Sequence, residues 1–258
     1  MKSSKMSEKK RVQLLRKACF ALLLTVIFLS GCDKKDDDVK ATSTETTAEF
    51  DNSNFGLYKG VIVGSSGTIK IEINNGNNVA KATITIDNET DALTSTSTLS
   101  NGKAISNATF NGSFSTFTFS VDANGKNPVI NSIDIQGHED VSAIVAKETS
   151  TDVALCYEGT STGGDDYSGV FNVVRNNNTF SAICKGNDKQ TFSFTGTADA
   201  NGSFSSQFTR TLFGFLSVKF TISGSFSGSQ TSGEWKTEWR IDDDYYTNSG
   251  TFTGNRKL

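Results

Sequence analysis

Two tryptophans near the C-terminus are the first residues whose type and spacing could do chemistry. Trp235, Thr237 and Trp239 alternate with charged residues in the stretch Glu234–Arg240. Successive side chains of a β-strand point to opposite faces, so both indoles would share one face and the charges the other. The pair predicts either a platform that stacks on sugar rings or the core face of a half-buried strand. We favour the core face, because large aromatic residues that alternate with charges usually mark such a strand.

Three consecutive carboxylates, Asp242, Asp243 and Asp244, follow directly. Clustered carboxylates in a loop supply the oxygen ligands that Ca²⁺ prefers, so this run is a candidate calcium site. The alternative is a solvated turn, which is the usual setting of a short charge run. We favour the turn and predict no bound metal.

The single histidine of the chain, His138, excludes a zinc site built on a His pair. A Ser-His-Asp hydrolase would have to use this residue, but its place beside Glu139 and Asp140, between two expected strands, is typical of an exposed loop. We therefore predict no catalytic residue. A carboxylate pair of the glycosidase kind stays open, because the sequence does not show which carboxylates lie close in space.

The first 31 residues have the order of an export signal. Residues 1–17 carry seven basic side chains and one acid, and the apolar run Ala18–Leu29 follows. This run is shorter than the roughly 20 residues that span a bilayer, but it suits the centre of a signal peptide. Ser30 and Gly31 then precede Cys32.

This order resembles the lipobox of bacterial lipoproteins, in which the Cys thiol is diacylated and the bond before it is cut. The resemblance implies that 1–31 is a lipoprotein signal peptide and that Cys32 carries diacylglycerol and acyl chains. That covalent lipid is then the only non-protein group we expect, and the membrane is a partner through it. The alternatives are an uncleaved N-terminal anchor and an ordinary secretory signal cut nearby.

The residues after Cys32 read Asp33-Lys34-Lys35-Asp36-Asp37-Asp38. They resemble the Lys-then-acidic tether of surface-displayed lipoproteins of the Bacteroidetes type, which implies an outer-membrane location and exposure at the cell surface. An Asp directly after the Cys would instead suggest retention at the inner membrane under enterobacterial sorting rules. Residues 32–54 contain almost no apolar side chains, so we expect the lipidated Cys to be followed by a disordered acidic tether.

The charge balance excludes one class of partner. Without residues 1–31 the chain carries 18 Lys and Arg against 27 Asp and Glu, a net charge of −9. Such a surface repels phosphate backbones, so nucleic acid is not expected as a partner. A glycan or protein partner remains open.

Two cysteines remain once Cys19 is removed with the leader and Cys32 is lipidated, namely Cys156 and Cys184. Thiols of exported proteins tend to oxidise, so a disulfide between these two is the natural expectation. If the strands form a simple meander, however, a third strand separates the two residues. Their Cα atoms would then lie roughly 10 Å apart, which is beyond the reach of a disulfide. We favour the disulfide.

Period-2 alternation and turn residues dominate from Leu57 onward, and no helical periodicity of useful length is present. Asn-Gly pairs at residues 75–76, 101–102, 124–125 and 201–202 predict tight hairpins, and hairpins mean antiparallel pairing. The predicted strands are Leu57–Val63, Thr68–Ile73, Val79–Ile86, Ala108–Val121, Val129–Ile135, Val141–Lys147, Asp152–Gly159, Tyr167–Arg175, Thr179–Cys184, Thr191–Thr197, Ser203–Thr209, Leu216–Ser223, Glu234–Ile241 and Tyr245–Phe252. The fold class is therefore all-β, an antiparallel β-sandwich or β-barrel.

A sparse internal repeat suggests two copies of one β-unit. Tyr58-Lys59-Gly60 is followed by a strand that ends in Asn-Asn, and Tyr157-Glu158-Gly159 is followed by another such strand about one hundred residues later. We expect unit 1 at residues 55–150 and unit 2 at 151–258. These units would form two sandwiches in tandem or close into one continuous domain.

The leading functional hypothesis is a surface-anchored lipoprotein with a non-enzymatic binding or structural β-domain. One alternative is a carrier of small apolar ligands built as a calycin-like barrel, for which the apolar stretch 212–222 would line the cavity rather than fill a core. A second alternative is a glycan-binding or glycan-cleaving accessory protein. A cavity inside a closed barrel would favour the carrier, and exposed, coplanar Trp235 and Trp239 would favour glycan binding.

Overall fold

The computed structural model describes residues 45–258 except 76–78, 165–167, 188 and 213. The expected signal peptide, the lipidated Cys32 and the first part of the tether lie outside these residues. In the described part the only helical element is a short 3₁₀ turn, Ala48–Phe50, and all other regular structure is antiparallel strand. The prediction of an all-β fold with two repeated units is confirmed. No helix in this part has the length and apolar character that a bilayer span requires.

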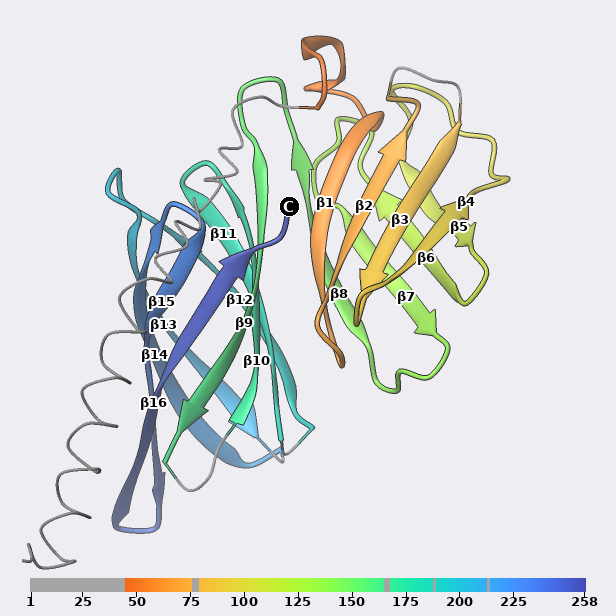
Figure 1. Ribbon diagram of the computed structural model, residues 1–258. Helices are drawn as coiled ribbons and strands as arrows, with labels where there is room; N and C mark the ends of the chain where they lie inside the picture. The colour runs from red at the N-terminus through yellow and green to blue at the C-terminus, as the bar shows by residue number, and fades with distance from the viewer. Residues whose placement is uncertain (1–44, 76–78, 165–167, 188, 213) are drawn as a thin grey trace, which may run out of the picture. The chain divides into compact units, whose positions relative to one another are not determined.

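The first eight strands form one nearly closed sheet, which we call the N-terminal barrel (Figure 1). Each strand pairs with the next, and β1 also pairs with β8, so the two end strands β7 and β8 come side by side. The strands are β1 (Gly56–Val63), β2 (Gly67–Ile73), β3 (Ala80–Ile86), β4 (Glu89–Thr94), β5 (Ile105–Asn111), β6 (Ser115–Val121), β7 (Val129–Ile135) and β8 (Ser142–Glu148).

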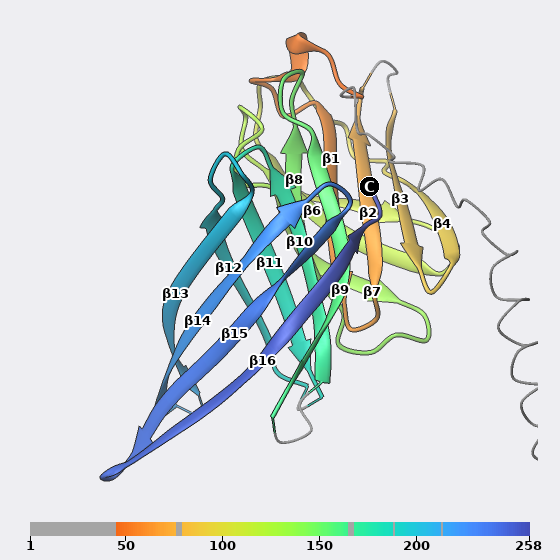
Figure 2. The same cartoon turned by 60° about the vertical axis from the view of Figure 1, so that its left-hand side comes forward.

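The last eight strands form a second sheet of the same kind, the C-terminal barrel (Figures 1 and 2). Its first strand, β9, pairs with its last, β16, and its end strands are β12 and β13. The strands are β9 (Ala154–Gly163), β10 (Ser168–Asn176), β11 (Thr179–Gly186), β12 (Thr191–Thr197), β13 (Ser203–Leu212), β14 (Leu216–Ser227), β15 (Gln230–Ile241) and β16 (Asp244–Arg256).

Both barrels therefore follow one plan, in which eight strands run up and down in chain order and the first pairs with the last. The repeated Tyr-x-Gly motif lies at the same place in each, because Tyr58 is on β1 and Tyr157 on β9. Both tyrosines are buried, and each hydroxyl donates to a backbone carbonyl, that of Asn54 at 2.9 Å and that of Gly228 at 3.5 Å.

The predicted Asn-Gly turns are confirmed at two of the described positions. Gly102, Gly125 and Gly202 each follow an Asn and have φ angles of 71°, 78° and 83°, in the left-handed region that glycine adopts without steric cost. Gly125 and Gly202 close short turns, in which each glycine N–H donates to the carbonyl of an Asp three residues earlier. The tight hairpin predicted at 101–102 is wrong, because this pair lies in the long connection between Thr94 of β4 and Ile105 of β5.

Two strands differ from the prediction. The expected long strand Ala108–Val121 is a hairpin, because β5 ends at Asn111 and β6 begins at Ser115. Strand β4 was not expected, since its residues Glu-Thr-Asp-Ala-Leu-Thr lack a clear apolar alternation. Asp91 explains both differences. Its buried carboxylate accepts bonds from the backbone N–H groups of residues 113–115, so a polar residue at an inward position holds the turn between β5 and β6.

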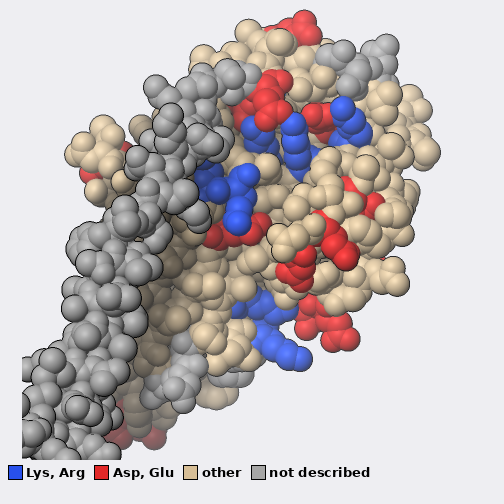
Figure 3. Space-filling model, in the orientation of Figure 1, with Lys and Arg blue, Asp and Glu red and all other residues tan. Residues whose placement is uncertain are grey.

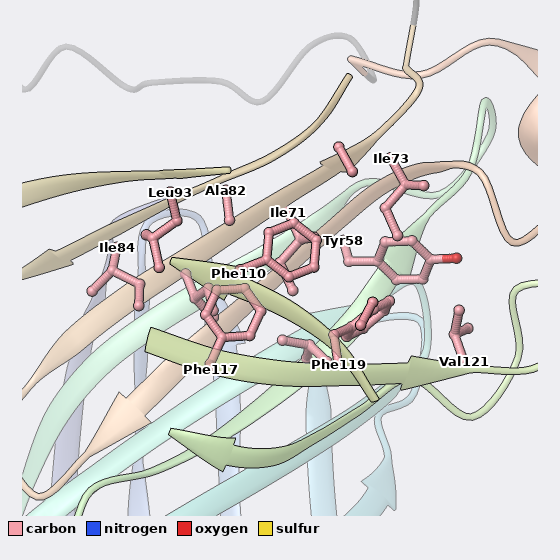
Figure 4. Packing of buried hydrophobic residues seen from close by; sticks show 14 of the residues in the cluster. Tyr58, Ile71, Ile73, Ala82, Ile84, Leu93, Phe110, Phe117, Phe119 and Val121 are labelled. Atoms are coloured by element: carbon pink, nitrogen blue, oxygen red, sulfur yellow. The ribbon is translucent and has the colours of Figure 1, made fainter. Parts of the chain in front are cut away.

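Large apolar side chains fill the interior of the N-terminal barrel (Figure 4). Phe110 and Phe117 stack with ring centroids 4.7 Å apart, and Tyr58 meets Phe119 edge to face at 5.1 Å. Isoleucines 69, 71, 73 and 84 complete the layer with no exposed surface. Burial of this apolar area is the main driving force for closure of the barrel.

The prediction of a disordered tether is wrong for residues 45–54, because these residues pack against the N-terminal barrel. Phe50 is buried, and the Glu45 carboxylate bridges Lys59 at 3.0 Å and also pairs with Lys70. Lys59 in turn forms an ion pair with Glu148, which has no exposed surface, at 2.8 Å. The prediction of disorder was based on the scarcity of apolar residues in 45–54. It missed this packing because part of it is made by ion pairs, which a pattern of apolar residues does not show.

These ion pairs belong to a row of alternating charges across the outer face of β1, β2 and β3 (Figure 3). Glu72 on β2 lies 3.3 Å from Lys70 and 2.7 Å from Lys81 of β3. Opposite charges on neighbouring strands stabilise the sheet modestly, since most of these side chains reach solvent.

The two barrels contact one another through an apolar cluster made by the outer faces of β1, β8, β9, β10 and β11. Val61, Val63, Cys156, Val174 and Ile183 form its buried centre. Asn172 has no exposed surface, and its Nδ2 donates to the Ile62 carbonyl at 2.6 Å while its Oδ1 accepts from Gly159 at 3.0 Å. Strand β1 is buried along its whole length because its two faces serve the interior of one barrel and the contact with the other.

Candidate ligand cavity in the C-terminal barrel

A cavity of about 330 Å³ lies inside the C-terminal barrel. Its wall is formed near the ends of the strands, where β13 finishes at Leu212, β14 begins at Leu216 and Trp239 approaches the end of β15. The lining residues are Ser161, Phe171, Cys184, Gln190, Phe192, Leu212, Leu216, Val218, Phe220, Ile222, Trp235, Thr237, Trp239 and Asn248. The apolar stretch 212–222 supplies five of these residues, so it lines a cavity as well as contributing to the core.

The opposite end of the same barrel is filled by aromatic rings. Phe180, Phe204 and Phe226 contact one another with ring centroids 4.7–5.5 Å apart, and Tyr157 lies 5.4 Å from Phe226. All four are buried. None of these four rings lines the cavity, so this aromatic plug fills a different part of the barrel from the cavity.

Trp235 and Trp239 lie in the cavity wall and are each half-buried. Trp235 occupies space left by a glycine, since a Cβ on Gly163 would come within 2.4 Å of the Trp235 ring. Trp239 stacks on Tyr246 of the paired strand with centroids 5.8 Å apart and an interplanar angle of 11°. The two indoles therefore lie on the same inward face of β15, in the wall of the cavity.

The polar groups of the wall are few. Among the lining residues that the structure describes, Ser161, Gln190, Thr237 and Asn248 have a polar side chain, as do Cys184 and the two tryptophans, and none is a carboxylate or a histidine. The Thr237 hydroxyl donates to the Asn248 carbonyl at 3.4 Å. The cavity therefore offers a mostly apolar surface with a small number of hydrogen-bonding positions.

The expected disulfide between Cys156 and Cys184 is wrong, because both thiols are free. Strand β10 lies between their strands, in the meander order that puts a disulfide out of reach. The residues also point to opposite faces of the sheet: Cys184 lines the cavity, whereas Cys156 packs between the barrels. Burial raises the pKa of both thiols, so neither is an activated nucleophile.

The spacing Gly159-x-Ser161-x-Gly163 has the form of a hydrolase nucleophile motif. Here it lies within strand β9 and not at a strand-to-helix turn, and Ser161 points into the cavity with no histidine in the same wall. The motif therefore carries no catalytic arrangement.

His138 lies in the N-terminal barrel and contacts Ser65 and Asp87. The Ser65 hydroxyl is 2.7 Å from His138 Nδ1, and an Asp87 carboxylate oxygen is 3.8 Å from the same nitrogen. A Ser-His-Asp triad needs serine and carboxylate on different ring nitrogens, so these three residues cannot pass a proton in that way.

Asp242, Asp243 and Asp244 form the turn between β15 and β16. Asp242 has a φ angle of 52°, and Arg240 donates to the Asp242 carbonyl and the Asp243 carboxylate, each at 2.6 Å. In the described part of the chain no group of three or more Asp, Glu, His or Cys side chains converges as a metal site requires. The arrangement is that of a solvated turn.

Apolar side chains are exposed around the mouth of the cavity. Four of the six large hydrophobic residues with high exposure, Phe215, Ile241, Tyr245 and Tyr246, belong to the β13–β14 and β15–β16 hairpins. Figure 2 shows the β15–β16 hairpin extending past its neighbours at this end. An apolar rim of this kind is common beside apolar binding sites.

In comparisons with known proteins, no protein-family model, no curated protein and no solved structure matches the chain.

Proposed function

We propose that this protein binds a small apolar ligand in the cavity of its C-terminal barrel and is held at the outer membrane by lipid on Cys32. The observation that carries the binding proposal is the cavity itself, about 330 Å³ within a wall of aromatic and aliphatic side chains. This volume lies at the lower end of the range for small-molecule sites, roughly 300–1,000 Å³.

The composition of the wall favours binding over catalysis. General acid–base chemistry needs a titratable group within hydrogen-bond reach of the substrate, and the described residues of the wall include neither a carboxylate nor a histidine. Its one thiol has a pKa that burial raises, so it is protonated at neutral pH. A ligand in this cavity is therefore held and not transformed.

Both tryptophans of the chain line the cavity, so intrinsic fluorescence reports directly on its occupancy. The test uses N-phenyl-1-naphthylamine, a neutral apolar probe whose own fluorescence rises in an apolar site. Titration into the purified mature protein is expected to show saturable binding with one site per chain and a matching change in tryptophan emission.

Thr237→Phe and Thr251→Phe form a matched pair of variants. Thr237 points into the cavity, whereas Thr251 is exposed on the outer face of β16. A phenyl ring at 237 fills the cavity and is expected to weaken probe binding by about tenfold or more, while the same ring at 251 leaves it unchanged. Equal binding by both variants, or no saturable binding by the native protein, would refute the cavity proposal.

The anchoring proposal rests on the lipobox resemblance at Cys32 and has its own test. Mass spectrometry of the N-terminal peptide is expected to show a chain that begins at a lipidated Cys32. Protease added to intact cells is expected to degrade the protein if it is displayed at the surface. An unmodified thiol with residues 1–31 still attached would refute the anchor, and protection from protease would refute surface display.

A further inference from the structure

The C-terminal barrel has a seam between its end strands β12 and β13. These strands are not joined by a hydrogen-bonded ladder, and a single bridge, Ala198↔Phe204, connects them at the end near the aromatic plug. Toward the cavity end the seam is spanned by side chains. Phe194 of β12 stacks on Phe208 of β13 with centroids 5.3 Å apart.

Arg210 spans the seam beside the cavity. Its Nη2 donates to the Ser193 carbonyl of β12 at 2.6 Å. Its guanidinium lies over Phe192, 5.8 Å from the ring centroid, and over Phe208 at 6.0 Å. Phe192 lines the cavity and Arg210 itself does not, so the guanidinium lies next to a ring of the cavity wall, at the place where β12 and β13 share no ladder.

The charge of Arg210 has no carboxylate to neutralise it within the described residues. None of the ion pairs found there includes Arg210. Its positive charge acts on Cys184 in the wall, where it opposes the rise in pKa that burial causes. A guanidinium has five N–H donors, and the bond to Ser193 uses one of them.

From this arrangement we infer that the ligand of the cavity is an apolar molecule with one anionic group, and that Arg210 binds that group at the seam. The inference rests on the proposed function, since it assigns the chemistry of the same ligand. The apolar body lies against Phe192, Phe220 and the tryptophans, and a carboxylate, sulfonate or phosphate at its end pairs with the guanidinium. Arg is suited to this role because its planar donors match two oxygens of such a group.

The experiment compares two probes that differ by one charged group. 1-Anilinonaphthalene-8-sulfonate has the ring system of N-phenyl-1-naphthylamine and adds a sulfonate. The anionic probe is expected to bind the native protein more tightly than the neutral one. Arg210→Gln is expected to weaken the anionic probe by about tenfold and leave the neutral probe unchanged, since a hydrogen-bonded ion pair is lost.

Arg175→Gln is the matched control. Arg175 also donates to one backbone carbonyl, that of Asn177 at 2.8 Å, and also lies over an aromatic ring, that of Phe226 at 4.9 Å. It contacts the plug and not the cavity wall, so its loss is expected to leave both probes unchanged. Arg210→Lys keeps the charge without the planar donors and is expected to retain part of the preference for the anionic probe.

The outcomes separate the two proposals. If the neutral probe binds and Arg210→Gln weakens both probes equally, or neither, the assignment of Arg210 is wrong while the cavity proposal stands. If neither probe binds the native protein, the proposed function itself fails. Thermal unfolding of each variant shows whether the barrel remains folded, and Arg210→Lys decides the question if Arg210→Gln does not fold. Displacement of the neutral probe by decanoate and decyl phosphate is expected to be stronger than by decanol, and the stronger of the two anions shows whether a carboxylate or a phosphate is preferred. Equal displacement by decanol would overturn the inference.

Discussion

The two barrels share a strand plan but differ in what they enclose. Strands of the N-terminal barrel have 6 to 8 residues, whereas β13 to β16 of the C-terminal barrel have 10 to 13. At roughly 3.3 Å per residue, the longer strands add about 10–20 Å of wall. Large buried side chains fill the shorter barrel along the length of its strands, whereas the aromatic plug fills only one end of the longer one. The two barrels have the same strand plan, so the cavity of the C-terminal barrel results from its longer strands and not from a different topology.

The barrels also share a weak joint, between the fourth and fifth strands. In the N-terminal barrel β4 and β5 share a single residue pair, Thr94↔Asn111, and in the C-terminal barrel β12 and β13 share a single bridge. Each joint is supported by one charged residue. Asp91 is 2 % exposed and accepts five hydrogen bonds from residues 113–115, whereas Arg210 is half-buried and donates one. A buried network closes the first joint, and the second is where we propose that the anionic group of the ligand binds.

The largest expected effect tests the contrast between a filled and a hollow interior. Phe117→Ala removes a ring that is 1 % exposed and stacked on Phe110, so it should lower the free energy of unfolding by about 4 kcal/mol. Phe220→Ala removes a half-buried ring beside an existing cavity, so it should cost only about 1–2 kcal/mol and enlarge the cavity. Urea denaturation measures both. Equal losses would show that the C-terminal interior is as tightly packed as the N-terminal one.

The next effect concerns the closed joint. Asp91→Asn keeps the size of the side chain but places an amide N–H₂ against backbone donors, so we expect a loss of about 2–3 kcal/mol. Burial alone would raise the pKa of Asp91, but the bonds from Ser115 and Ser113 outweigh it and the pKa lies below its ordinary value of 3.8. The folded carboxylate therefore resists protonation more than the unfolded one.

The sign of the pH dependence follows from this lowered pKa. The contribution of Asp91 to stability is complete above about pH 4 and is lost as the pH falls further, because the unfolded state binds the proton first. Denaturation midpoints of the native protein and Asp91→Asn should therefore converge as the pH is lowered from 5 toward 2. A gap between the two that stays constant over this range would contradict the assignment.

The open joint should be far less sensitive. Arg210 is half-buried, and its one hydrogen bond and two ring contacts are worth little in water, so Arg210→Gln should change the free energy of unfolding by less than about 1 kcal/mol. Thermal unfolding with and without the anionic probe provides the measurement. A loss as large as that of Asp91→Asn would show that Arg210 holds the barrel together and is not kept for a ligand.

The sequence predicted the class of fold but not its interior. Period-2 alternation and the Asn-Gly turns identified antiparallel strands, and the Tyr58 and Tyr157 motifs marked the repeat. Strand β4 escaped because Asp91 occupies an inward position that the alternation assigns to apolar residues. The disulfide was wrong because residue type and compartment do not say which face of a strand a Cys occupies.

The cavity could not be predicted from the sequence for a related reason. Val218 and Ile222 have the same alternation whether they face a plug or a hollow, so only the lengths of all eight strands and the position of the aromatic plug distinguish the two. Arg210 gives no signal of its own, since a basic residue among threonines is typical of any exposed strand. The role we propose for Arg210 depends on the missing hydrogen-bond ladder between β12 and β13. Whether two strands pair is decided by how the whole sheet closes, so the sequence of neither strand shows it.

The smallest effect we predict compares the two free thiols, and it separates the hollow interior from the contact between the barrels. Burial raises the pKa of both, so both should react slowly with iodoacetamide at neutral pH. Cys184 lines the cavity and should be labelled faster than Cys156, which is sealed between the barrels. Peptide mapping by mass spectrometry follows each thiol separately.

Saturation with N-phenyl-1-naphthylamine should slow the labelling of Cys184 alone, because the reagent must enter the space that the probe fills. If the probe slowed both thiols equally, it would be acting by stabilising the whole fold, and the cavity would not be where it binds.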